Sequence, residues 1–272
     1  MKNIIALFTI LFILSSCQKE DFEIINLSNN KIIVLGHGGM GIGNTYPMNC
    51  FESILNCLSL GADGTEIDVQ MTKDGVLVAF HDEFLENSTN ISGKIFNKTW
   101  NEISNATYND PPYTKYKLLT LDNLFSNIAN PTEYIFFFDC KNFNPNTSSL
   151  YLNTFNNALI KLIDKYYFTN NVYIEFKRKD LIKSLLDKRP DLKIFIYSDF
   201  DTALITANEF QLQGIATSVD NISKEQVLKA HSEGFMIAVF NAHSYNRNIE
   251  AIEKNVDFIQ SDKVKHLIKI LK

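Results

Sequence analysis

The fold of this chain is decided by residues 61–69, GADGTEIDV, which are followed by VAFHD at residues 78–82. The second half of the first segment is typical of an extended strand bounded by glycine. Glu66 and Asp68 are two residues apart there, so both carboxylates leave one face with Cα atoms roughly 6.6 Å apart. Two carboxylates on an apolar strand repel each other and are costly to bury without a cation. The stretch therefore predicts ligands for a hard divalent metal ion.

Two histidines lie near this pair in the predicted arrangement. His81 is in the second segment, after the turn KDG at residues 73–75, and His37 ends the apolar run VLGHGG at residues 34–39. Histidine is the most common general acid and base in enzymes. Two histidines beside a carboxylate metal site suit acid–base cleavage of a phosphate ester.

The rest of the chain alternates apolar strand-like runs with amphipathic helical stretches, such as 49–60, 149–166, 179–187, 224–233 and 246–255. Eight such strands against helices predict an α/β fold, a parallel (β/α)8 TIM barrel. In that barrel catalytic groups lie at the carboxyl ends of the strands. The predicted strands are 32–36, 64–69, 133–139, 171–176, 192–197, 213–217, 235–240 and 256–260.

One interval is too long for a simple strand-to-helix connection. About fifty residues separate the second strand from the helical stretch near Leu121. Asp74-Gly75 between two extended runs is a hairpin signal, and residues 108–117 are rich in turn-forming residues. We therefore expect a small insertion at about 73–117, after the second strand.

The order of these motifs resembles the glycerophosphodiester phosphodiesterase family. That family has a strand ending in His-Arg-Gly, then Pro-Glu-Asn-Thr, Gly-Ala-Asp-x-x-Glu-x-Asp-Val, Thr-x-Asp-Gly and Val-x-x-His-Asp. Residues 61–69, 72–75 and 78–82 match the central pattern in order and spacing. FDCK at residues 138–141 falls where the family has Glu-x-Lys, and VDFIQSD at residues 256–262 resembles its closing motif. The likeness runs from about residue 32 to 265.

The resemblance implies a role for each candidate site residue. Glu66, Asp68 and Asp139 would hold Ca²⁺ or Mg²⁺, and His37 and His81 would act as the general acid and base. Asp139 stands where the family has Glu; related sphingomyelinase D-type phospholipases have Asp at that ligand position. Lys141 would contact a phosphate oxygen. Phe240 would form an apolar wall for the substrate.

Two departures bear on the substrate. Gly38 stands where the family has an Arg that is expected to bind the substrate phosphate. Met48 replaces the Glu of the family's Pro-Glu-Asn motif. The glycine-rich residues 36–43, Gly38 and Gly39 above all, could instead offer backbone N–H groups to an anion. The two losses are expected to be linked, since an Arg and a Glu in one site would neutralise each other. We expect an active variant with altered substrate handling.

The predicted function is metal-dependent hydrolysis of a glycerophosphodiester to glycerol phosphate and an alcohol. One alternative is a phospholipase D-like cleavage of lysophospholipids. Another is a lipoprotein that binds phosphodiesters without turning them over. The net charge of −5 and the lack of a Lys/Arg stripe argue against nucleic acid as a partner.

Other polar and sulfur-bearing residues receive no catalytic role from the sequence. Glu175 ends the fourth predicted strand without an assignable function. His231 and His266 fall on helical stretches and are expected to be solvated. Cys50 and Cys57, seven residues apart, are too distant for a disulfide bond on a helix.

The amino terminus predicts export. Residues 1–16 combine a basic start with a short apolar run and end in Leu-Ser-Ser before Cys17, similar to a bacterial lipoprotein cleavage box. Cys17 would carry the lipid, residues 17–31 would be a polar tether, and residues 32–272 would be the barrel. The expected location is the periplasm or surface of a Gram-negative-type bacterium, anchored to the membrane.

Overall fold

The computed structural model of the chain describes residues 22–272. The predicted signal peptide and the predicted lipidation site, Cys17, lie outside the described residues.

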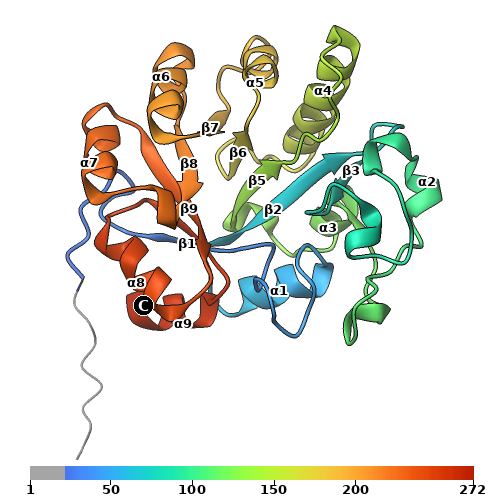
Figure 1. Cartoon of the computed structure of the whole chain (residues 1–272), viewed down its shortest axis with the longest axis horizontal. Helices are drawn as coiled ribbons and strands as arrows, with labels where there is room; N and C mark the ends of the chain where they lie inside the picture. Colours follow the sequence, from blue (N-terminus) through green and yellow to red (C-terminus); the bar gives the residue numbers. More distant parts are fainter. Residues whose placement is uncertain (1–21) are drawn as a thin grey trace, which may run out of the picture.

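Eight parallel strands close into a barrel, in the order β1-β10-β9-β8-β7-β6-β5-β2 (Figure 1). The ring closes because β1 pairs with β10 on one side, Ile33 opposite Phe258, and with β2 on the other, Leu35 opposite Gly64. The TIM-barrel prediction is confirmed, and each of the eight predicted strands is present. The barrel strands are β1 (Ile33–Gly36), β2 (Gly64–Met71), β5 (Ile135–Cys140), β6 (Val172–Phe176), β7 (Lys193–Tyr197), β8 (Gly214–Ser218), β9 (Met236–Ala242) and β10 (Phe258–Ser261).

Helices cover the outside of the barrel and bury the outward-facing side chains of the strands. Outward residues such as Ile67, Phe138 and Ile174 are fully buried beneath them. Among residues 22–272, no helix is both long enough and apolar enough to cross a membrane. The helices are α1 (Phe51–Ser59), α2 (Trp100–Ile103), α3 (Leu121–Ser126), α4 (Ser149–Lys165), α5 (Lys179–Leu186), α6 (Phe200–Phe210), α7 (Lys224–Ser232), α8 (Tyr245–Glu253) and α9 (Val264–Leu271).

Aromatic side chains fill the middle of the barrel. Phe137, Tyr173, Phe195 and Phe258 are in mutual contact, with ring centroids 4.8 to 6.1 Å apart. Because side chains on a strand alternate between its two faces, the next inward position on β5 after Phe137 is Asp139. The aromatic cluster thus forms an apolar floor directly beneath the carboxyl ends of the strands.

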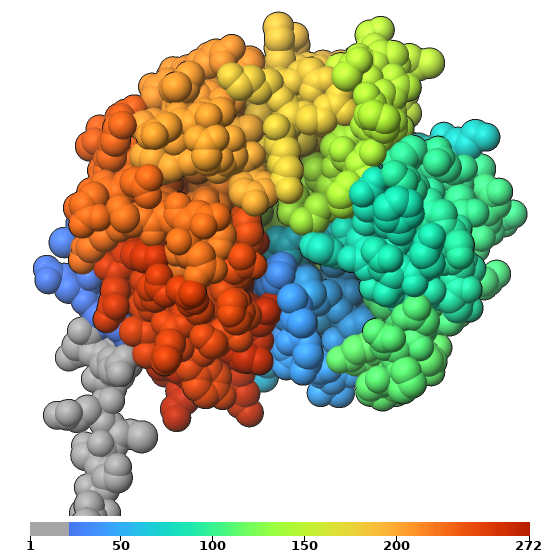
Figure 2. Space-filling view, in the orientation of Figure 1, coloured from blue at the N-terminus to red at the C-terminus, as the bar shows by residue number. Residues whose placement is uncertain are grey.

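The expected insertion is present and forms one flank of the molecule (Figure 2). β3 (Leu77–Ala79) pairs antiparallel with β2 and with β4 (Leu119–Thr120), which confirms the hairpin at Asp74-Gly75. Residues including Phe80, Leu85, Ile103 and Tyr116 form a separate small core. The Gln70 side-chain amide donates to the carbonyls of Phe80 and Asp82 and so fixes the segment that carries His81.

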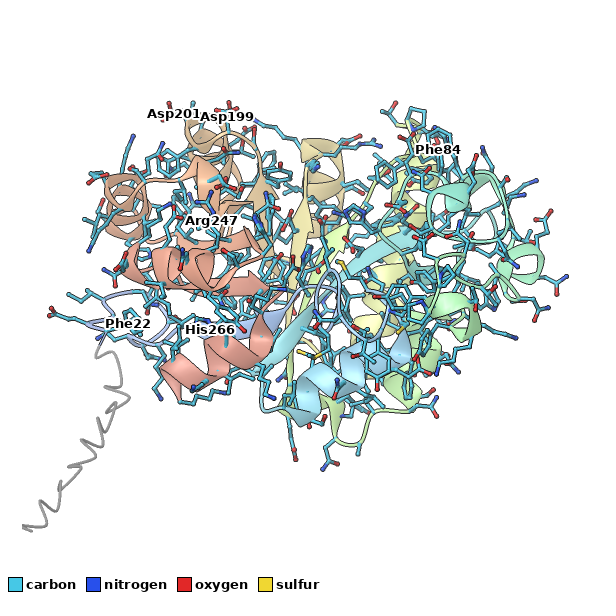
Figure 3. All side chains as sticks on the ribbon, turned by 60° about the horizontal axis from the view of Figure 1, so that its bottom comes forward. Phe22, Phe84, Asp199, Asp201, Arg247 and His266 are labelled. Atoms are coloured by element: carbon cyan, nitrogen blue, oxygen red, sulfur yellow. The ribbon has the colours of Figure 1, made fainter. Side chains whose placement is uncertain are left out.

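The last part of the expected tether, from Ile25 to Ser28, makes hydrogen bonds to residues 255–257 of the barrel domain. The N–H of Ile25 donates to the Asn255 side chain, and the Asn26 amide donates to the Val256 carbonyl. Asp257 accepts the N–H groups of Leu27 and Ser28. Figure 3 shows that Phe22, three residues before this segment, and Phe84 of the insertion lie on opposite sides of the molecule.

Asp257 links this segment to the barrel. Its other oxygen accepts from the N–H of Ile237, and His231 Nε2 lies 2.8 Å from the same atom. His231 is therefore partnered and only 9% exposed in its side chain, which contradicts the expected solvation. His266 is on α9 as expected, but its ring stacks on Tyr245.

We predict that Asp257→Asn lowers the free energy of unfolding by about 1–3 kcal/mol, because the buried N–H of Ile237 and the partly buried N–H groups of Leu27 and Ser28 lose a charged acceptor. Thermal denaturation would measure the loss, and limited proteolysis should cut residues 25–31 more readily. Exposed Asp201, changed to Asn, removes the same charge and serves as the control. Equal stability of the two variants would contradict the role given to Asp257.

Candidate active site

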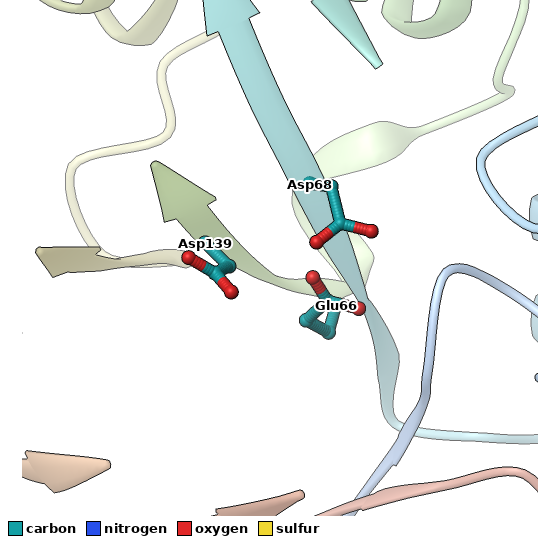
Figure 4. Close-up of side chains that lie close together, drawn as sticks. All are labelled: Glu66, Asp68 and Asp139. Carbon is teal, nitrogen blue, oxygen red and sulfur yellow. The ribbon is translucent and has the colours of Figure 1, made fainter. Parts of the chain in front are cut away.

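Three carboxylates meet at the carboxyl ends of two adjacent strands. Glu66 and Asp68 come from β2 and Asp139 from β5, with Asp68 directly opposite Asp139 in the strand register. One oxygen from each lies within 4.8 Å of the others. The three side chains point toward one another (Figure 4). The structure thus brings together the residues predicted as metal ligands.

The chain holds one oxygen of each β2 carboxylate by hydrogen bonds and leaves the other without a hydrogen bond. Gly38 donates its N–H to Glu66 Oε2 at 2.8 Å. The Asn49 amide donates to Asp68 Oδ2 at 2.6 Å, and its carbonyl accepts the Asp68 N–H at 3.0 Å. Glu66 Oε1 and Asp68 Oδ1 are buried and accept no hydrogen bond. Oriented oxygens of this kind fit a hard divalent cation such as Ca²⁺ or Mg²⁺.

Lys141 supplies a positive charge to the same cluster. Its ammonium lies 3.1 Å from Asp68 Oδ1 and also pairs with Asp139. Burial alone would lower the pKa of Lys141, but the surrounding carboxylates outweigh it and raise this pKa above its ordinary value. Lys141 is therefore a fixed cation at the level of the carboxylates, where a phosphate oxygen would need one.

The carboxylates differ in how easily they ionise. Burial, reinforced by the charges of Asp68 and Asp139, raises the pKa of Glu66 well above its usual value, and burial also raises that of Asp139. Burial acts in the same direction on Asp68, but Lys141 and the two histidines prevail and lower its pKa. Any further positive charge near the cluster would favour the ionised forms of these carboxylates.

Both histidines present the same atom to the site. His37 Nδ1 lies 2.8 Å from Asp262 Oδ1, and His81 Nδ1 lies 3.0 Å from Asp82 Oδ1. Nε2 takes no part in these contacts in either ring. The hydrogen bond to Asp82 raises the pKa of His81. The His81 side chain is 54% exposed and that of His37 is 15% exposed, so the two differ in their access to solvent.

The glycine-rich loop is engaged within the chain. The Gly38 N–H donates to Glu66 and the Gly39 N–H donates to the Thr65 hydroxyl at 3.0 Å. These two N–H groups therefore already have acceptors within the chain, and an anion-binding role for residues 36–43 stays a prediction. Their role is to orient the carboxylate strand.

Gly38 and Met48 are linked by packing. Gly38 has a φ of +52°, and a Cβ built on it would lie 2.8 Å from Met48 Cβ. A side chain at position 38 therefore requires the segment around Met48 to move. The two departures are coupled sterically, in addition to any coupling by charge.

A cavity of about 370 Å³ opens beside His81, between the glycine-rich loop and the insertion. Most of its wall is apolar or aromatic, with contributions from Ile42, Tyr46, Met48, Phe80 and Tyr113. Phe240 does not line this cavity. It lies at the end of β9, partly exposed, with its ring edge against Tyr197 at 5.2 Å between centroids.

Three positioning residues escaped the sequence analysis. Asn49 follows Met48 in the altered motif, Asp82 is adjacent to His81, and Asp262 ends the last strand motif. Because Asp82 directly follows His81 in the sequence, its contact with that histidine could have been predicted. The partners of Asn49 and Asp262 lie 19 and 225 residues away, so only the fold reveals them.

The structure is a (β/α)8 barrel with a cluster of three carboxylates and two carboxylate-backed histidines. The glycerophosphoryl diester phosphodiesterase family model matches residues 40–266, and the chain belongs to this family. The chain is 26% identical over 249 residues to a glycerophosphodiester phosphodiesterase of Caldanaerobacter subterraneus, covering 89% of this chain and 98% of the relative. It is 25% identical to one of Bacillus subtilis, covering 83% and 80%.

Solved structures share the fold. One is described as a putative glycerophosphodiester phosphodiesterase of Galdieria sulphuraria, with a TM-score of 0.76, 20% identity and coverage of 88% of this chain and 97% of that one. Another is an Oleispira antarctica phosphodiesterase in complex with the product sn-glycerol-3-phosphate, with a TM-score of 0.76, 16% identity and coverage of 87% and 95%.

Asn49→Gly should weaken the affinity for Ca²⁺ or Mg²⁺ about 10-fold, because it removes the amide that orients Asp68. Glycine accepts the φ of +61° at this position, so the backbone is preserved. Isothermal titration calorimetry measures the affinity. Asn130→Gly, at an exposed residue with a φ of +48°, is the matched control. Unchanged affinity in Asn49→Gly would show that the amide is dispensable.

Proposed function

We propose that this member of the glycerophosphodiester phosphodiesterase family hydrolyses glycerophosphodiesters to glycerol phosphate and an alcohol and that this activity depends on Ca²⁺ or Mg²⁺. The observation that carries the proposal is the buried cluster of Glu66, Asp68 and Asp139 beside two carboxylate-backed histidines. The glycerol phosphate bound to the Oleispira antarctica protein supports the substrate class.

The charged residues divide between metal and phosphate. Glu66, Asp68 and Asp139 would hold the cation, which when bound stabilises negative charge on a non-bridging phosphate oxygen. Lys141 would pair with another phosphate oxygen, since its ammonium already lies at the level of the carboxylates. Phe240, on a different strand from these groups, would offer an apolar wall to the glycerol portion.

The histidines would move the protons. We assign His81 as the general acid, because Asp82 favours its protonated form and its side chain is the more exposed. His37, held by Asp262, would be the general base that deprotonates the nucleophile. The cavity beside His81 would then receive the departing alcohol. Water and a neighbouring substrate hydroxyl both remain open as the nucleophile.

Substitutions of the metal ligands and of the proton-transfer residues should affect cation affinity and turnover differently. Glu66→Gln or Asp68→Asn should weaken cation affinity as well as activity, because each removes a charged ligand. His37→Ala and His81→Ala should keep cation affinity near wild type while turnover of glycerophosphocholine falls about 10²-fold or more. Calorimetry and a product assay at saturating cation separate the two effects. A histidine variant with full activity would remove that residue from the mechanism.

The pH profile distinguishes the roles of the histidines. Because Asp82 raises the pKa of His81, Asp82→Asn should lower that pKa. If His81 is the acid, activity falls as pH rises through its pKa, so the alkaline limb of kcat against pH moves to lower pH. The neighbouring Glu83→Gln removes the same charge and should leave the profile nearly unchanged. A shift of the acidic limb instead would make His81 the base.

Cleavage of lysophospholipids is a second candidate, favoured by the largely apolar wall of the cavity beside His81. Turnover of lysophosphatidylcholine at a higher kcat/KM than glycerophosphocholine would support it. The non-catalytic alternative is disfavoured, because the family membership is joined by a complete set of carboxylates and histidines.

The membrane anchor is a separate proposal that rests on residues 1–17. We propose that Cys17 is lipidated and that the protein is exported and held at a membrane facing the periplasm or cell surface. Cys17→Ser should then move the protein from the membrane fraction to the soluble fraction, as judged by fractionation and immunoblotting. A variant that stays membrane-bound, or a mature wild type that begins at another residue, would contradict the anchor.

A further inference from the structure

A fourth carboxylate, Glu175, lies beside the cluster. It is in β6, directly opposite Asp139 of β5, and Asp139 is opposite Asp68 of β2. The three acidic residues therefore form one row across three neighbouring strands, which are spaced about 4.8 Å apart. Tyr173, two residues before Glu175, belongs with the aromatic floor of the barrel. Glu175 faces the barrel interior for the same reason that Asp139 does.

Glu175 lacks the partners that a buried structural carboxylate needs. The residue is 1% exposed, and its Oε1 makes no hydrogen bond. A buried carboxyl oxygen without a partner is unfavourable unless a cation or a proton satisfies it. The charged groups that act on it are Asp139 and Asp68, which repel it, and Lys141 and Lys177, which attract it.

We infer that Glu175 is a further ligand for the cation held by Glu66, Asp68 and Asp139. The inference rests on the proposed function and deepens it. The neighbouring Asp139 is one methylene shorter than the Glu that the family pattern has at this point. The side chain of Asp139 reaches less far than a Glu side chain would. Glu175, which has the longer side chain and lies on the adjacent strand, would supply a carboxylate oxygen that compensates for this difference.

The charges at this end of the barrel agree with this inference. Lys141 pairs with Asp68 and Asp139, and the charge of Lys177, whose ammonium lies over the Tyr197 ring, also acts on Glu175. With neutral histidines, the four ionised carboxylates would have two more negative charges than these two lysines compensate, and a divalent cation would balance them. A residue with a purely structural role would instead be expected to have both oxygens satisfied within the chain.

The test measures cation binding without substrate. Glu175→Gln keeps the shape and removes the charge, so the dissociation constant for Ca²⁺ or Mg²⁺ should rise about 10-fold or more by calorimetry. The melting temperature without added cation should stay the same or rise, because a repelling carboxylate is gone. Glu209→Gln, at an exposed position of α6, changes the net charge equally and should leave both values near wild type.

A double-mutant cycle addresses the compensation directly. Asp139→Glu restores the longer carboxylate, so the loss of cation affinity caused by Glu175→Gln should be smaller in that background than in the wild type. Equal losses in the two backgrounds would show that Glu175 does not compensate for Asp139.

The possible outcomes are distinguishable. If wild type binds no divalent cation, the proposed metal dependence fails and this inference fails with it. If wild type binds a cation and Glu175→Gln binds it within twofold as well, only the role of Glu175 is overturned. If Glu175→Gln does not fold, Glu175→Asp is tested instead, because it keeps the charge. A higher dissociation constant for the cation in Glu175→Asp would support ligation by Glu175. An unchanged dissociation constant would contradict it.

Discussion

Repulsion among buried carboxylates is the constraint on which the active site depends. Glu66 and Asp68 are almost fully inaccessible, and Asp139 lies opposite Asp68 in the register of the barrel. Burial and mutual repulsion disfavour their ionised forms, so positive charge must come close to them. Lys141 supplies one charge within the chain. The remaining unpartnered oxygens explain why a divalent cation is the natural complement of this site.

The surrounding fold keeps these groups in place. The aromatic floor beneath the cluster closes the barrel on one side, so ligands must enter from the carboxyl ends of the strands. In the glycine-rich loop, Gly38 and Gly39 donate their N–H groups to Glu66 and Thr65. The insertion, fixed through Gln70, brings His81 to the rim. Each histidine is backed by its own carboxylate through Nδ1, so Nε2 of both rings takes no part in these contacts.

The sequence predicted the parts of the molecule that local patterns determine. Apolar runs separated by amphipathic stretches identified all eight barrel strands, and the two-residue spacing of Glu66 and Asp68 placed both on one face. Contacts between distant segments were missed, such as those of Asn49 with Asp68 and of Leu27 and Ser28 with Asp257. The hydrogen bond from the Gly38 N–H to Glu66 was also missed, because it depends on the folded glycine-rich loop.

The central claim is that Glu66, Asp68 and Asp139 form the site of a divalent cation. Anomalous diffraction from crystals grown with Mn²⁺, in place of Ca²⁺ or Mg²⁺, tests it most directly. The account predicts a strong peak among the oxygens of these three residues, with the Lys141 ammonium drawn away from Asp139. A peak elsewhere, or no peak with Lys141 still paired to Asp68 and Asp139, would contradict it.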